Sequence, residues 1–464
     1  MSTASRRPVA AAATAVAWAV ALWIIWISVR WGRDLQRSTP EVLLGAAPLV
    51  GRKSRDGWDW RFAWSLVGAG AIAFALSVSC WRGWWFQLRL RWVALAAAIG
   101  SMAFATLLAL TDGADGILYG AEHRSEYLAN LPITPPAGEF VRTFTARLHE
   151  YSVHIRGHPP GFVLVLELLE WIGIGGGWST AMLSVLGTGL LAVGVLVVVL
   201  QLAGAEWMRR AAPFLVVSPY LIWMITSADA VFTGVAALGI AAIAVGIARR
   251  RPVAALLGLA GGVVLGGVMF ATYLGAVLLI VPGALVIHGL WRRRPGAVPA
   301  AAGALFGGLV VTVAFRLAGF WWLDGASATR DEYWAGTAQF RTWGYFGLAN
   351  LAAALIALGP TAFAGILRLR DRRMWLVVGA AVTALLVSHL SQYTRGEVER
   401  IWLLFYPWIA VAGASLFVPR VVVAGESAAD NGVRFVVRQH RAAIWLAAQA
   451  MGAIALQAAL VTKW

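Results

Sequence analysis

Long apolar stretches that are almost free of charge decide what this chain can fold into. A helical membrane span needs about 20 mostly apolar residues, and backbone groups surrounded by lipid must be satisfied inside the segment, which makes each span a helix. The sequence therefore predicts an all-α polytopic membrane protein with thirteen spans. The predicted spans are 8–29, 62–80, 92–110, 178–202, 211–226, 229–248, 252–270, 271–291, 298–317, 346–367, 374–390, 401–418 and 443–461.

The composition supports this class of protein. Of the 464 residues 60% are hydrophobic and 13% are charged, whereas soluble domains are about 45–50% apolar and about 25% charged. A soluble globular protein and a disordered chain are both excluded. The single cysteine, Cys80, allows no internal disulfide and no cysteine cluster for a metal. We expect one integral membrane domain over residues 1–464, within which residues 111–177 form an extracytoplasmic loop.

Arginine runs predict the orientation. The net charge of +16 would suggest nucleic acid in a soluble protein, but here the basic residues stand in short segments between spans. Such segments are cytoplasmic by the positive-inside rule. The threading places the N-terminus inside, the C-terminus outside and the protein in the plasma membrane, with residues 30–61 as a basic exception outside. The runs are Arg82, Arg89 and Arg91; Arg209 and Arg210; Arg249 to Arg251; Arg292 to Arg294; and Arg368, Arg370, Arg372 and Arg373.

One apolar segment, residues 161–174, is too short to be counted as a span. It has 14 residues and contains Glu167 and Glu170. Counted as a span, it would move every later arginine run to the outside. We therefore predict a re-entrant or interfacial helix that stays on the outer side.

Two carboxylates stand where the third span leaves the membrane. Asp112 and Asp115 are three residues apart, at the start of a polar loop of about 50 residues. A loop of this length is usually functional. A carboxylate in this position can act as a general base toward an acceptor hydroxyl. An ordinary helix cap or a solvated turn is the alternative.

The end of that loop carries basic residues before a Pro-Pro pair. His154, Arg156 and His158 precede Pro159–Pro160, which restricts the backbone as the chain re-enters the interface. Arginine binds phosphate through its fork of donors, and histidine donates when protonated. A water-exposed rim is the alternative to a phosphate site.

Four further outer turns or loops hold polar residues beside apolar spans. Asp229 follows Ser227–Ala228, and either caps the following helix or lines a site. Glu397 and Arg400 are three residues apart before the span 401–418, either as a simple ion pair or with the arginine held for a lipid phosphate. The remaining pocket candidates are Tyr273, and Arg330 and Tyr333 in a Trp-rich segment that also suits an interfacial aromatic belt.

These pieces resemble the GT-C superfamily of membrane glycosyltransferases. The resemblance rests on Asp112/Asp115, the HPPG stretch His158–Gly161 and the turn Ser227–Asp229, and it spans roughly residues 112–408. The chain is most similar to uncharacterised actinobacterial membrane proteins with HPPG and GEVERIW-like stretches, here Gly396–Trp402. The resemblance implies a polyprenyl-phosphate sugar donor used outside the cytoplasm. Related enzymes often have lysine before the Pro-Pro pair, so His158, Arg156 and Arg400 all stay open as phosphate ligands.

The sequence thus predicts an inverting glycosyltransferase that moves a sugar to a cell-envelope glycan or glycolipid. Asp112 is the expected base and Asp115 the alternate or supporting carboxylate, while His154, Asp229, Tyr273, Glu397, Arg330 and Tyr333 are expected to line the pocket. Membrane lipid is an expected partner and nucleic acid is not. A divalent cation suits the chemistry, but no convincing ligand set is present. The alternatives are a transporter or flippase of a lipid-linked sugar or other amphiphile, and a structural partner in a cell-envelope complex.

Overall fold

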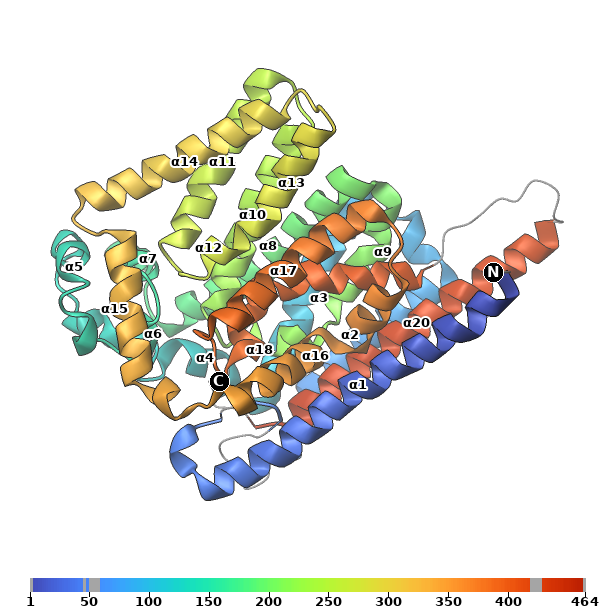
Figure 1. Cartoon of the computed structure of the whole chain (residues 1–464), viewed down its shortest axis with the longest axis horizontal. Helices are drawn as coiled ribbons and strands as arrows, with labels where there is room; N and C mark the ends of the chain where they lie inside the picture. The colour runs from blue at the N-terminus through green and yellow to red at the C-terminus, as the bar shows by residue number, and fades with distance from the viewer. Residues whose placement is uncertain (1–2, 45–46, 50–58, 418–427, 462–464) are drawn as a thin grey trace.

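The computed structural model describes residues 3–44, 47–49, 59–417 and 428–461, and their secondary structure is helical. Ten helices in these residues are long and apolar enough to cross a membrane, and the chain is an all-α polytopic membrane protein (Figure 1). The helices that contain these spans are α1 Thr3–Ser38, α2 Trp64–Arg82, α3 Leu90–Ala109, α8 Gly177–Ala203, α10 Asp229–Ile247, α11 Arg251–Met269, α14 Ala297–Leu317, α16 Trp343–Arg368, α17 Arg372–Ser391 and α20 Ala428–Ala459.

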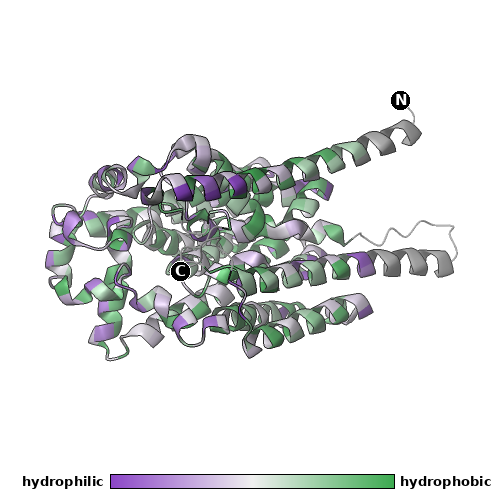
Figure 2. Ribbon diagram, turned by 90° about the horizontal axis from the view of Figure 1, so that it is seen from below, coloured by the Kyte–Doolittle hydropathy of each residue, from purple (hydrophilic) through white to green (hydrophobic). Residues whose placement is uncertain are grey.

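Shorter helices connect the long ones or extend from their ends. They are α4 Asp115–Glu122, α5 Ala137–Thr143, α6 Val153–Arg156, α7 Gly161–Trp171, α9 Ala205–Val216, α12 Gly275–Leu278, α13 Ile280–Trp291, α15 Trp322–Ala335, α18 Val398–Ile401 and α19 Tyr406–Ala410. Short 3-10 turns complete the connections, among them η1 Pro40–Val42, η3 Leu110–Asp112, η6 Pro219–Trp223, η7 Thr337–Phe340, η8 Trp402–Leu404 and η9 Val411–Leu416. Figure 2 shows apolar residues along the long helices and more polar ones toward the short helices.

Ten of the thirteen predicted spans coincide with long helices, and the other three lie on interrupted ones. Segment 211–226 breaks after Val216, before Ser218–Pro219. Segment 271–291 divides into α12 and α13. Segment 401–418 consists of η8, α19 and η9, and its last residue lies outside the described residues. The number of thirteen spans therefore stays a prediction.

Burial explains how two of the interrupted segments fit a membrane protein. Residues 219–224 and 402–414 are buried throughout, and Tyr220, Trp223, Trp402 and Trp408 are among the largest fully buried side chains. Irregular backbone at membrane depth is tolerated where protein, not lipid, surrounds it. The interruptions thus form the centre of the helix bundle.

The short helices α4 to α7 occupy the predicted outer loop. Helix α7 has 11 residues, or about 16 Å at 1.5 Å per residue, which is too short to cross a hydrocarbon core of about 30 Å. Helix α5 ends at Thr143 and is followed by a 3-10 turn at Leu148–Glu150.

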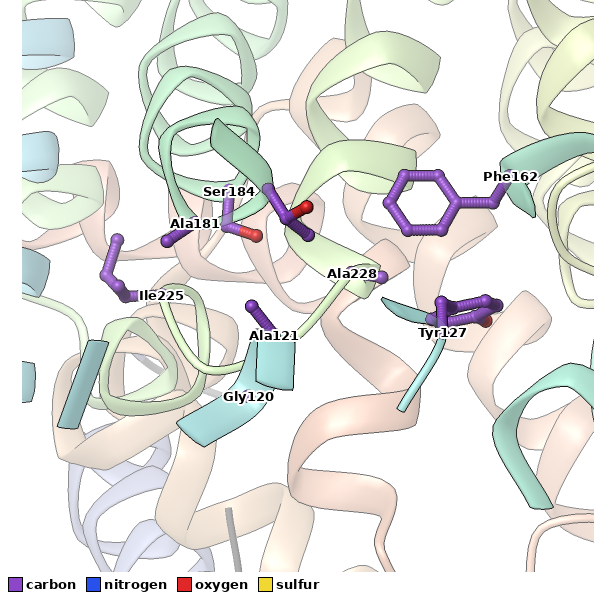
Figure 3. Close-up of a pocket in the computed structure, with 9 residues that line it drawn as sticks. Gly120, Ala121, Tyr127, Phe162, Ala181, Ser184, Ile225 and Ala228 are labelled. Carbon is purple, nitrogen blue, oxygen red and sulfur yellow. The ribbon is translucent and has the colours of Figure 1, made fainter. Parts of the chain in front are cut away.

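Close backbone contacts fix this loop against the bundle. A Cβ at Gly161 would lie 2.4 Å from the carbonyl oxygen of Phe270, and one at Gly120 would lie 2.1 Å from that of Thr226. Only glycine permits such an approach. Figure 3 shows the contact region around Gly120, Tyr127 and Phe162. The cavity there measures about 10 Å³, room for a single water, so it is not a substrate site.

Contacts between segments that follow or precede the long helices show which of them lie at the same end of the molecule. At one end the Trp85 indole donates to the Arg209 carbonyl at 2.8 Å and the Arg209 guanidinium donates to the Leu88 carbonyl. At the other end Arg156 pairs with Glu332, and the Arg341 guanidinium donates to the Leu43 carbonyl. The arginine-run loops in these contacts therefore lie at one end, and the polar loops, including the N-terminal one, lie at the other.

Which end faces the cytoplasm is a prediction that cysteine labelling tests. In a Cys80→Ser background, a membrane-impermeant maleimide should label Ser327→Cys on intact cells and Arg292→Cys only after permeabilisation. Both positions are exposed, whereas Cys80 is buried. Labelling of both variants on intact cells would contradict the predicted threading, and labelling of Arg292→Cys alone would reverse it.

Candidate functional site

A cavity of about 850 Å³ lies at the polar end of the bundle. It is formed by the loop after α1, by α6, α12 and α15, by the first residue of α10 and by the segment between the end of α17 and α18. Figure 1 shows α6 and α15 together at this end, with α18 nearer the centre. The volume falls within the range of small-molecule sites, about 300–1,000 Å³.

The structure brings nine of the eleven predicted site residues together around this cavity. They come from five segments that are separate in the sequence and that folding brings together. They are His154, Arg156, His158, Asp229, Tyr273, Arg330, Tyr333, Glu397 and Arg400. Asp112 and Asp115 do not line it.

Arg400 lies at the buried side of the cavity and is 6% exposed. Its Nη1 is 3.5 Å from Oδ2 of Asp229 and its Nη2 is 3.4 Å from Oε2 of Glu397. Asp229 is the first residue of α10 but does not cap it, because its carboxylate accepts from the Ser227 hydroxyl at 2.7 Å and faces Arg400. The predicted ion pair of Glu397 with Arg400 is thus present, with Asp229 as a second partner.

A tight backbone turn places Glu397 between two arginines. Gly396 has φ +85° and Glu397 has φ +60°, a left-handed conformation that glycine adopts freely and glutamate rarely does. The Asn350 side chain accepts from the Gly396 N–H at 3.0 Å and holds this turn. Burial alone would raise the pKa of Glu397, but Arg341 and Arg400 outweigh it and lower the pKa to about 2. Glu397 is therefore ionised at neutral pH.

Arg341 connects three parts of the chain around the cavity. Its side chain donates to the Leu43 carbonyl at 2.6 Å, to the Arg395 carbonyl at 2.6 Å and to Glu397 at 3.1 Å. Buried arginines need such a full set of acceptors. Arg341 was not among the predicted site residues, although it stands in the Trp-rich segment with Arg330 and Tyr333.

A second buried side-chain contact holds the loop before the Pro-Pro pair. Glu126 Oε2 lies 2.7 Å from Nδ1 of His154, and both side chains are buried. Glu126 was also missed, because a lone carboxylate in a long loop has no distinguishing pattern. The pair joins the chain after α4 to α6 and so positions the residues that follow.

His158 has a defined tautomer. Its Nδ1 is 2.8 Å from the His154 carbonyl oxygen, and a carbonyl only accepts, so Nδ1 carries the proton and Nε2 is left as an acceptor in the neutral ring. Burial lowers the pKa of His158, and the charge of Asp229 opposes this only in part. Burial thus favours the neutral ring of His158.

Helix α15 closes one side of the cavity through polar contacts in its C-terminal half. Arg156 Nη1 lies 2.8 Å from Oε2 of Glu332, and the Thr329 hydroxyl donates to the Arg156 carbonyl at 2.9 Å. The Tyr333 hydroxyl accepts from the Arg395 N–H at 2.9 Å. Arg330 is exposed and pairs with Asp331 at 3.1 Å.

Asp112 makes a different contact from the one expected. Its carboxylate pairs with Arg61, whose guanidinium also donates to the carbonyls of Gln457 and Leu460 at 2.7 Å each. This ties the end of α3 to the end of α20. Asp115 begins α4 and is exposed, and it makes no ion pair with any residue in the described ranges. Gly113, with φ +67°, separates the two carboxylates, which therefore do not share one helix.

The charges around the cavity favour an anionic ligand. Five arginines and three carboxylates line it, which gives a formal charge of +2 with both histidines neutral. Apolar side chains, among them Leu274, Val277 and Leu323, line another part. In the part of the chain that the structure describes, no group of three or more His, Cys, Asp or Glu residues could hold a metal ion. The cavity thus suits an amphiphile with an anionic group.

Comparisons with known proteins give a distant structural likeness and no match in sequence. No protein-family model matches the chain, and no curated protein matches its sequence. Among solved structures, the crystal structure of ArnT from Cupriavidus metallidurans in the apo state is similar with a TM-score of 0.41 and 15% identity. The match covers 72% of this chain and 76% of that one. It says nothing about the residues of the cavity.

Glu399, next to Arg400, should make the stability of the folded protein depend on pH. Both carboxylate oxygens are buried without a hydrogen-bond partner among the described residues. Burial raises the pKa of Glu399 from 4.5 to about 7, and Glu397 adds to the rise. The folded protein therefore binds this proton more tightly than the unfolded chain, so the stabilisation is complete below about pH 4.5 and is lost as the pH rises to about 7.

We expect wild type to lose stability relative to Glu399→Gln over this pH range, by on the order of 3 kcal/mol. Thermal unfolding of the detergent-solubilised protein from pH 4.5 to 8 measures the difference. The exposed Glu139→Gln is the matched control, which should follow wild type. A constant difference between wild type and Glu399→Gln across this range would show that Glu399 does not titrate there.

Proposed function

We propose that this protein is an inverting glycosyltransferase that takes a sugar from a polyprenyl-phosphate donor and passes it to a cell-envelope acceptor on the outer face of the plasma membrane. The observation that carries the proposal is the cavity of +2 formal charge at the polar end of a helix bundle. A lipid phosphate fits the arginines, and a polyprenyl neck fits Leu274, Val277 and Leu323. The GT-C resemblance of the sequence motifs points to the same donor class.

The proposed reaction needs few groups. The acceptor oxygen forms a bond to the anomeric carbon, the bond from that carbon to the phosphate oxygen breaks, and a carboxylate takes the hydroxyl proton. Negative charge grows on the departing phosphate, where Arg400, Arg156 and a His158 protonated by the phosphate's field stabilise it. The phosphate leaves as a stable anion and so needs no general acid.

The geometry changes which carboxylate is proposed as the base. Asp112 is held by Arg61, so its carboxylate is already engaged and is not free for an acceptor hydroxyl. We therefore assign the base to Asp115 and a positioning role to Asp112. This assignment requires the donor sugar to reach the start of α4. If the sugar does not reach it, the role passes to Glu332, which lines the cavity but must first part from Arg156.

The position of the charges favours transfer over transport. Transporters usually bind substrate near the bilayer midplane, at broken helices between repeats. Here Asp229 is the first residue of α10, and Arg400 and Glu397 precede the interrupted segment 402–416. The charged cluster therefore lies at helix ends, where an acceptor from the aqueous side can reach it.

Variants of the three carboxylates test the proposal. Asp115→Asn should lower transfer by about 10²–10⁴-fold, the usual contribution of a positioned base, with a normal protein level. Asp112→Asn should lower the melting temperature, because it breaks the contact with Arg61. The same variant should change the transfer rate much less than Asp115→Asn does. The measurement is transfer of radiolabelled mannose, glucose or arabinose from polyprenyl phosphate in membranes.

Arg400→Lys keeps a positive charge between Asp229 and Glu397 and should raise the KM for the donor. If Asp115→Asn is fully active and Glu332→Gln is not, the base moves to Glu332. Full transfer in all three carboxylate variants would contradict the mechanism. Movement of a fluorescent lipid-linked sugar across proteoliposomes would then favour the flippase.

A further inference from the structure

Arg395 differs from the other arginines that line the cavity. Arg156, Arg330, Arg341 and Arg400 each have a carboxylate within 4.0 Å, from Glu332, Asp331, Glu397 and Asp229 respectively. Within the residues that the structure describes, no such carboxylate partner is found for Arg395. Its positive charge on the cavity wall is therefore balanced by no neighbouring anion.

The Arg395 side chain is nevertheless held in one position. Its Nη1 donates to the Arg341 carbonyl at 2.6 Å and its Nη2 donates to the Gln392 side chain. Its guanidinium carbon lies 4.6 Å from the centre of the Trp334 ring, a cation–π contact. The Nε–H is buried without a hydrogen-bond partner in the described residues. A guanidinium fixed in this way is ready to bind an anion at little entropic cost.

Aromatic rings surround this guanidinium. The ring centre of Tyr333 lies 5.2 Å from that of Trp334 and 6.2 Å from that of Tyr393. Tyr333, Tyr393 and Arg395 all line the cavity, and Tyr393 is 48% exposed. Tyrosine offers an apolar face and a polar hydroxyl, which suits the apolar C–H face and the hydroxyls of a sugar ring. A cation and an open aromatic ring thus stand side by side.

We propose that Arg395 and Tyr393, with Trp334 packed on the Arg395 guanidinium, form a second subsite of the cavity that binds an acidic saccharide, one whose ring carries a carboxylate or a phosphate ester. The anionic group pairs with Arg395, where arginine's fork of donors fits either anion, and the sugar ring packs on Tyr393. The bound saccharide is the acceptor of the transfer, a role that rests on the proposed function. Its binding does not depend on that function.

Binding to the purified full-length protein in detergent tests the subsite directly. Trigalacturonate and its methyl ester form a matched acidic and neutral pair, and glucose 6-phosphate and glucose form the phosphate pair. Isothermal calorimetry should give at least a tenfold preference for the acidic member of one pair or both, and which pair shows it identifies the anion. Arg395→Gln should abolish the preference, because a charged hydrogen bond contributes about 1.5–3 kcal/mol, or roughly 10- to 100-fold in Kd.

Further variants separate the site from the overall charge of +16. Arg147→Gln removes an exposed arginine that pairs with Glu150 away from the cavity, and it should keep the preference. Arg395→Lys should keep part of it. Tyr393→Ala, at an exposed position, should weaken the binding of both members of each pair.

Equal affinity for the acidic and neutral members of both pairs would overturn the proposal, as would an unchanged preference in Arg395→Gln. Acidic-saccharide binding that requires Arg395, together with no transfer from any polyprenyl-phosphate sugar, would contradict the proposed function and leave the subsite standing. The two proposals can therefore fail separately.

Discussion

The rest of the polar end depends on the ion pairs of Arg400 with Asp229 and Glu397. Removing three charges from water costs several kcal/mol for each ion unless partners compensate, and here each charge faces an opposite one at 3.4–3.5 Å. Asp229 begins α10 and Glu397 precedes α18, so the pairs join two parts of the chain that are distant in sequence. Loss of one member would leave its partner buried and uncompensated.

Further contacts extend this network around the cavity. Arg341 connects Glu397 with the N-terminal loop through the Leu43 carbonyl, and Glu126 holds His154 of α6. Helix α15 joins through Arg156 and Tyr333. The cavity is therefore the space left between segments fixed by charge and hydrogen bonds, and its excess of arginine makes it a binding site for an anion.

Much of the architecture could be predicted from the sequence, because lipid leaves helices as the main solution for long apolar segments. The prediction was less complete for 211–226, 271–291 and 401–418, whose helices are interrupted. In 211–226 and 401–418 the breaks lie in buried backbone inside the bundle, which hydropathy does not reveal. Local polarity was enough to find nine residues that line one cavity. It could not show that Asp112 pairs with Arg61 or that Glu126 pairs with His154, since both contacts join segments that only folding brings together.

The role of Arg395 could not be predicted from the sequence either. In the sequence it is one charged residue in a charged turn, beside Glu397 and Arg400. Only the structure shows that Glu397 pairs with Arg341 and Arg400 and that the charge of Arg395 has no such partner among the described residues. The helix periodicity and the positive-inside rule carry no information on such pairings.

The central claim is that the polar-end cavity binds a lipid phosphate against Arg400, Arg156 and His158. Electron cryo-microscopy of the full-length protein in nanodiscs with decaprenyl phosphate tests this claim most directly. We predict phosphate density within hydrogen-bond distance of at least one of these three residues, with the prenyl chain along Leu274, Val277 and Leu323. Phosphate density outside the cavity, or a cavity without lipid at saturating decaprenyl phosphate, would contradict the account.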